Sequence, residues 1–146
     1  RFETNSPIRT FTTFAIGGKP HLLAAYTCTP LVKFPLTDLT PDNKVRGTTI
    51  AELGNRNRPL DMFVYEKGGE DFVLMANTSR GVMKITTSGM DRSNGITDRI
   101  ADKAGQEYDT IKALQGVVQL DRLNRDNAVV LVQSDQTFAL LTVALP

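Results

Sequence analysis

Residues 58–85 read RPLDMFVYEKGGEDFVLMANTSRGVMKI. The runs Leu60–Tyr65, Phe72–Ala76 and Val82–Thr86 are short and rich in β-branched or aromatic residues, and Gly, Pro, Asn or Asp stands in every gap between them. This pattern is typical of β-strands joined by tight turns. The Gly-Gly doublet suits a two-residue hairpin, because glycine readily adopts the positive φ that such a turn requires. The stretch therefore predicts three successive antiparallel strands.

The same plan recurs along the chain. Residues 22–34 match residues 73–85 at an offset of 51, and residues 6–18 match residues 58–69 with one residue of slip, so that Phe11 lies over Phe63 and the Gly-Gly doublets coincide. A weaker third copy, residues 129–141, follows at an offset of 56 with asparagines in place of the glycines. We therefore divide the single domain 1–146 into repeats of approximately 7–53, 59–114 and 117–146. Residues 88–107 are interpreted as a surface insertion, in which residues 97–104 are expected to form a helical turn.

Four-stranded units that repeat about every 50 residues are typical of a β-propeller. The pattern P-x-D-x-F-V-x-x-x-G-G-x-x-x-V-x-x-A-N-x-x-R-G-V-x-K-I at residues 59–85 resembles the NHL and YVTN-like propeller repeats. The resemblance implies an all-β propeller segment of about three four-stranded blades. It also implies that ligands gather on the face of the ring opposite the Gly-Gly turns, and that the protein is periplasmic or secreted.

Three blades are fewer than the four to eight that close a typical propeller. The ring is therefore expected to be completed by the missing remainder of a longer chain, by a second cleaved fragment, or by another copy of this chain, which would give six blades. The first segment, near Phe2–Thr4, is expected to be an outer strand, and the chain is expected to end in a third strand at Phe138–Leu145. The start at Arg1 suggests a processed or truncated chain.

Composition excludes several classes of function. With 17 Lys and Arg against 16 Asp and Glu, the net charge is +1, which argues against a nucleic-acid or anionic-membrane surface. No apolar run approaches the roughly 18 residues of a membrane-spanning helix. The single cysteine and single histidine exclude an internal disulfide and a cysteine-based zinc cluster, and they remove most histidine-based catalytic sites. No metal site and no particular cofactor are indicated.

The candidate ligand-binding residues are those that the propeller arrangement would place on the face opposite the Gly-Gly turns: Arg9, Tyr26, Cys28, Arg58, Asp61, Asn77, Thr78 and Arg80. Arg58 and Arg80 are candidates for an anion-binding cluster, or alternatively for pairing with Asp61 and capping exposed carbonyls. Cys28 is interpreted as a small structural cysteine rather than a reactive thiol, because no histidine or cationic partner lies nearby in the sequence.

The absence of nucleotide-binding and hydrolase motifs favours a non-catalytic scaffold or binding module that recruits a protein or a small ligand at the ring face. The alternative is part of a propeller enzyme, such as a lactonase-like hydrolase or a quinone-dependent dehydrogenase, with its site in the central channel. A sugar-binding propeller built from identical short chains is disfavoured, because the sequence has no tryptophan and only three tyrosines.

Overall fold

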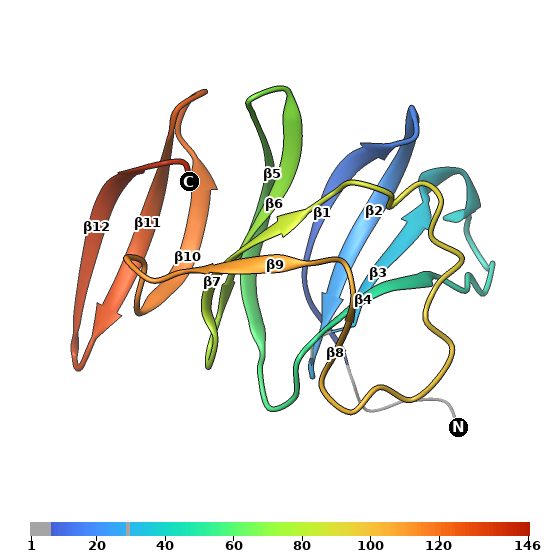
Figure 1. Cartoon of the computed structure of the whole chain (residues 1–146), viewed down its shortest axis with the longest axis horizontal. Coiled ribbons are helices and arrows are strands. Elements are labelled where there is room, and N and C mark those ends of the chain that lie inside the picture. Colours follow the sequence, from blue (N-terminus) through green and yellow to red (C-terminus); the bar gives the residue numbers. More distant parts are fainter. Residues whose placement is uncertain (1–6, 29) are drawn as a thin grey trace.

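The computed structural model describes residues 7–28 and 30–146. Its strands within these ranges are β1 (Ile8–Ile16), β2 (Lys19–Tyr26), β3 (Pro30–Pro35), β4 (Thr48–Leu53), β5 (Pro59–Lys67), β6 (Glu70–Asn77), β7 (Gly81–Thr86), β8 (Lys103–Gly105), β9 (Tyr108–Ile111), β10 (Val117–Arg122), β11 (Asn127–Ser134) and β12 (Thr137–Ala144). They form three antiparallel sheets, which we call N-terminal (β1-β2-β3-β4-β8), central (β5-β6-β7-β9) and C-terminal (β10-β11-β12). The sheets stand side by side (Figure 1), and their inner strands β1, β5 and β10 are neighbours. The prediction of an all-β chain is confirmed.

The hairpins form where the sequence predicts them. Gly68 and Gly69 connect β5 to β6 with φ values of +65° and +83°, and Gly17 and Gly18 connect β1 to β2 with similar values. In the third copy the side-chain oxygen of Asn124 accepts hydrogen bonds from the backbone N–H groups of residues 126 and 127, each at 2.9 Å. Asparagine therefore organises the turn that the doublets organise in the other two copies.

The number of strands differs from the expected four in the N-terminal sheet, which has five. The central sheet has the expected four, and the C-terminal sheet has three, in keeping with a chain that ends in a third strand. The expected outer strand near Phe2–Thr4 lies outside the described residues. The described part of the chain ends in β12, the third strand of its sheet, at the predicted place. No sheet closes on itself, and the propeller stays a prediction.

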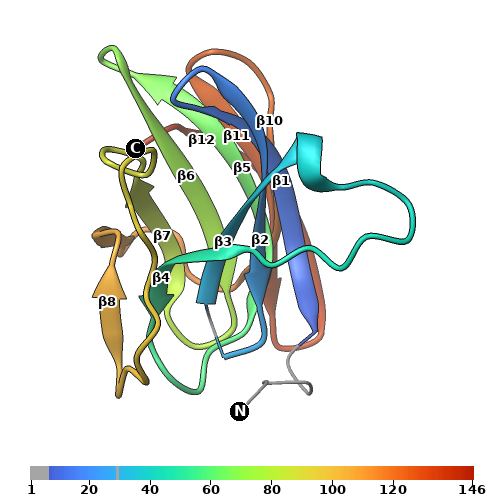
Figure 2. The same ribbon diagram turned by 90° about the vertical axis from the view of Figure 1, so that its right-hand side faces the viewer.

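The expected helical turn at residues 97–104 is wrong. No α-helix occurs in the described ranges, and no helix there has the length and apolar character needed to cross a membrane. The segment is irregular until β8, which pairs with β4 at the outer edge of the N-terminal sheet (Figure 2). The chain then returns to the central sheet, where β9 pairs with β7. Residues 88–107 thus form a strap that links two sheets.

The strap also contributes to the core. Met90 has no exposed surface and lies in the apolar layer between the N-terminal and central sheets. The buried ammonium group of Lys33, in β3, donates hydrogen bonds to the carbonyl oxygens of Met90 and Ser93. Buried charges need such partners, so the hydrogen bonds of Lys33 depend on the strap.

Two apolar layers hold the sheets together. The layer between the N-terminal and central sheets includes Leu23, Ile50, Met62, Met75 and Ile85. The layer between the central and C-terminal sheets includes Tyr65, Leu74, Val82, Leu120 and Val130. The central sheet is therefore covered on both faces, which explains the near-continuous apolar sequence of β6.

Each inner strand has a β-bulge near its start. One residue there is left without a partner in the register of the neighbouring strand: Arg9 in β1, Leu60 in β5 and Val118 in β10. The bulges lie at the same place in each sheet, so they define which residues of the three repeats are equivalent.

This equivalence corrects the alignment of the repeats by one residue. Aligning the bulges places Phe11 over Met62 rather than over Phe63, and it places Leu131 over Ala76, an offset of 55 rather than 56. Successive side chains of a strand point to opposite faces, so a slip of one residue exchanges the faces. Phe11 accordingly lies on the side of its sheet that faces away from the rest of the molecule.

Tyr65 provides a prediction about pH. Its side chain is 1% exposed, its hydroxyl donates to the carbonyl oxygen of Pro146 at 2.7 Å, and burial raises its pKa from 10.0 to about 12. The folded state holds this proton more tightly than the unfolded state, so the stabilisation is complete below pH 10 and is lost as the pH rises towards 12. We expect the free energy of unfolding to fall by about 2 kcal/mol across that range from this residue alone.

Urea unfolding at the two ends of that pH range tests this expectation. The Tyr65→Phe variant should lack this part of the fall, although it starts less stable by about 1 kcal/mol through the lost hydrogen bond. Burial also raises the pKa of Tyr26, so both proteins should be compared in a Tyr26→Phe background. An equal fall in the two proteins would contradict the assignment to Tyr65.

Candidate functional site

The bulges bring the starts of the three inner strands together around one open groove. The groove has a volume of about 390 Å³, and its lining residues are Arg9, Thr10, Phe11, Leu60, Asp61, Val118 and Gln119. All three bulged residues are among them. A bulge redirects a side chain out of the regular alternation of a strand, and bulges are frequent beside functional sites. The groove is thus built from the equivalent part of each sheet.

A second hollow adjoins the groove. It measures about 450 Å³ and lies between the central and C-terminal sheets, and it shares Leu60 and Val118 with the groove. Its polar lining comes from the turns that follow β6 and β11 and from the segment before β10, and it includes Asn77, Thr78, Gln115, Gln133 and Asp135. The two hollows thus meet at two apolar bulged residues, Leu60 and Val118.

The charges of the groove belong to Arg9 and Asp61. Arg9 is exposed, and its guanidinium makes no hydrogen bond or ion pair within residues 7–28 and 30–146. Asp61 is half-buried; one carboxylate oxygen accepts from the N–H of Met62 and the other from the N–H of Leu120, each at 3.0 Å. Asp61 therefore ties β5 to β10, and each of its oxygens keeps a lone pair for another donor.

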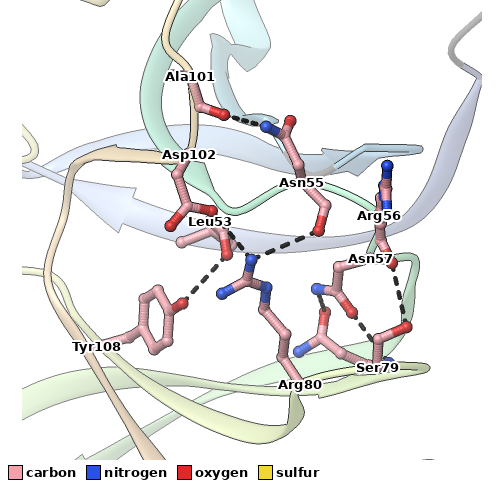
Figure 3. A network of polar contacts seen from close by, with 10 residues as sticks. Leu53, Asn55, Arg56, Asn57, Ser79, Arg80, Ala101, Asp102 and Tyr108 are labelled. Carbon is pink, nitrogen blue, oxygen red and sulfur yellow. Dashed lines mark hydrogen bonds and ion pairs between the residues drawn. The ribbon is translucent and has the colours of Figure 1, made fainter.

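Arg80 takes part in a network of polar contacts with Asn55 and Asp102, which we call the corner (Figure 3). Its guanidinium donates to the carboxylate of Asp102 at 2.9 Å and to the carbonyl oxygen of Asn55 at 3.4 Å. A β-carbon on Gly54 would lie only 2.4 Å from the guanidinium carbon, so the absence of a side chain at Gly54 makes room for Arg80. Asn55 in turn donates to the carbonyl oxygen of Ala101. The corner joins the loop before β5 to the strap.

Asn77 is also held by the fold. It is buried, and its amide nitrogen donates to the carbonyl oxygens of Met75 and Gly81 at 3.1 and 3.3 Å. Its amide oxygen accepts from the side chain of Asn57 at 2.9 Å, and Asn57 accepts from the N–H of Ser79 at 3.2 Å. These contacts fix the turn after β6 against the loop before β5.

The remaining predicted site residues are dispersed. The backbone N–H of Arg58 donates to the hydroxyl of Thr78, and the backbone N–H of Thr78 donates to the carbonyl oxygen of Arg58. The side chain of Arg58 is exposed. Tyr26 packs against the apolar cluster on the outer face of the N-terminal sheet. Cys28 is exposed with φ +66°. None of Arg58, Tyr26, Cys28 and Arg80 lines either hollow.

Of the eight predicted residues, the groove brings Arg9 and Asp61 together, and the adjoining hollow contains Asn77 and Thr78. The groove residues that the sequence did not predict are Thr10, Phe11, Leu60, Val118 and Gln119. Gln119 follows the bulge of β10 as Asp61 follows the bulge of β5, so it is the equivalent of Asp61 in the third repeat. The positions of the bulges would have identified it. The sequence alignment of the third copy covers only residues 129–141 and so does not include the strand that contains Gln119.

In the described ranges no group of three or more His, Cys, Asp or Glu side chains is placed to hold a metal ion. Comparison of the chain with protein-family models, with curated proteins and with solved structures finds no match.

Proposed function

We propose that the three sheets are blades of a β-propeller and that the chain serves as a binding module with its ligand site in the groove. The observation that carries the proposal is the convergence of three equivalent strand starts, each with a bulge, on one open depression. The inner strands β1, β5 and β10 lie next to one another, as the strands that line the channel of a propeller do. A site assembled from several blades is the arrangement that a propeller channel favours.

The groups in the groove indicate the chemistry of the ligand. The guanidinium of Arg9, which has no hydrogen bond or ion pair among the described residues, can donate two parallel hydrogen bonds to a carboxylate. Asp61 can accept from an ammonium or amide N–H group, and Gln119 can both donate and accept. We therefore propose a small ligand with both an anionic and an N–H group, such as an amino acid or the end of a peptide.

Titration of the ¹⁵N-labelled protein with glycylglycine tests this proposal by chemical shifts. We expect the perturbed amides to be those at the starts of β1, β5 and β10. The Arg9→Ala variant should bind at least about tenfold more weakly, because a hydrogen bond to a charged group contributes about 1.5–3 kcal/mol. Acetate and methylammonium, each with one half of the charge pattern, should perturb the same amides at higher concentrations.

Arg58→Ala is the matched control, because it removes an exposed arginine that lines neither hollow. It should bind like the parent protein. Equal weakening by the two substitutions would show a general effect of net charge, and shifts outside the groove would place the ligand elsewhere. Either result overturns the proposal.

A further inference from the structure

Each of the two outermost faces of the molecule has a region of exposed apolar side chains, and we call these regions the bare faces. On the outer face of the N-terminal sheet, Phe11 is 63% exposed. On the outer face of the C-terminal sheet, Phe138 and Leu140 are 61% and 71% exposed. Large side chains of this kind that cluster on one sheet face indicate an interaction surface.

The equivalent positions inside the molecule show what these faces lack. Phe11 corresponds to Met62, since each is the second residue after its bulge, and Met62 is 4% exposed because the N-terminal sheet covers it. Leu140 pairs with Leu131, which pairs with Gln119, the residue after the bulge of β10. Val82 pairs with Ala76, which pairs with Asp61, the residue after the bulge of β5. Leu140 therefore corresponds to Val82. Val82 has no exposed surface, because it packs in the layer shared with the C-terminal sheet.

The two bare faces are equivalent to the two faces that meet where neighbouring sheets pack within the chain. Within the chain, the Val82 face of the central sheet packs on the Leu120 face of the C-terminal sheet, and Leu120 is the second residue after its bulge, like Phe11. The outer face of the C-terminal sheet, which carries Leu140, can therefore pack on the outer face of an N-terminal sheet, which carries Phe11. The loop after β3 covers only part of the latter face: Val45 packs near Val32 and Phe34, while Phe11 stays bare.

We propose that a second copy of this chain binds head to tail, so that the C-terminal sheet of each copy packs on the N-terminal sheet of the other. Both bare faces of both copies are then buried by contacts that repeat those within the chain. The pair has two-fold symmetry, and its six sheets fall within the four to eight blades of closed propellers. The inference rests on the proposed propeller. It completes the groove, because the start of β1 then lies beside the start of the partner copy's β10.

Light scattering after size exclusion tests the assembly. Across dilution from roughly 100 to 1 µM, a range that spans ordinary dimer affinities, the protein should have twice the 16.1 kDa mass of one chain. Leu140→Asp places an unpaired charge in the interface and should weaken dimerisation by at least about 100-fold. Phe11→Asp should do the same, since a head-to-tail contact needs both faces. Both side chains are exposed in the single chain, so circular dichroism should show that the variants stay folded.

Leu123→Asp is the matched control. Leu123 is 52% exposed and lies in the turn between β10 and β11, away from both faces, so this variant should remain a dimer. Mixing Leu140→Asp with Phe11→Asp should restore a dimer in part, because one of its two interfaces is intact. A parent protein that is monomeric at every concentration overturns the proposal and assigns the bare faces to a different chain. A dimer that survives either substitution overturns the head-to-tail arrangement.

The two proposals fail separately. Leu140 is not among the groove residues, so the mass of Leu140→Asp reports on assembly alone. The glycylglycine shifts at Arg9 report on the groove in either state.

Discussion

Replacing Gly105 with alanine is expected to lower the free energy of unfolding by about 3–5 kcal/mol and to detach β8 from β4. Gly105 has φ +80°, and a β-carbon there would lie 2.1 Å from the carbonyl oxygen of Ile50 and 3.0 Å from the Cα of Ala51. Both are backbone atoms of β4, so neither can rotate away. The substitution combines an unfavourable backbone angle with a collision at the end of β8, where the strap meets β4. Urea unfolding followed by circular dichroism measures the loss.

Gly69→Ala separates the two causes. Gly69 has nearly the same backbone angle, φ +83°, but a β-carbon there would meet no atom within 4 Å. Its cost should be only the strain of a left-handed alanine, about 1–2 kcal/mol. The difference between the two variants measures the close approach of β8 to β4, and equal losses would contradict that contact.

Removal of the Asn77 side chain should cost about 2–4 kcal/mol, the second largest effect that we predict. Alanine at this position abolishes two donated hydrogen bonds and one accepted hydrogen bond. It also leaves the buried amide of Asn57, which is 1% exposed, without its acceptor. A buried polar group without a partner costs more than the bond itself contributed.

A double-mutant cycle with Asn57→Ala tests the pairing. The two side chains should show a coupling of about 0.5–3 kcal/mol, so the double variant should be more stable than the sum of the single losses predicts. Asn43→Ala is the control, since this exposed amide makes one hydrogen bond to a loop carbonyl, and its loss should stay within about 0.5 kcal/mol. Strictly additive losses would show that the two asparagines act independently.

Much of the fold follows from local patterns in the sequence. The strands and hairpin of residues 58–85 are specified by short apolar runs and by the glycines between them, and the structure has them where the pattern places them. The strap could not be predicted in this way. β8 has only three residues, and the segment is held by tertiary contacts: the burial of Met90 and the pairing with β4. Such contacts override weak local helix propensity.

The candidate site was predictable only in part. The propeller arrangement predicts Arg9 and Asp61 on the face opposite the Gly-Gly turns, and they do line one groove. The same arrangement predicts Arg80 there, but Arg80 pairs with Asp102, a residue of the strap whose position no local pattern indicates. Gln119 could not be identified in this way, because the third repeat was matched only over residues 129–141 and a bulge leaves no consistent residue type: arginine, leucine and valine stand at the three bulges.

That variety has a consequence for how such a protein changes over time. A bulged residue stands outside the alternation that assigns side chains to the core. Leu60 nevertheless packs in part against the layer between the central and C-terminal sheets, whereas Arg9 is exposed and belongs to neither layer. Exchanging the residue at position 9 therefore alters the charge of the groove and leaves the strand pairing on either side as it was, so this position can change ligand preference separately from stability.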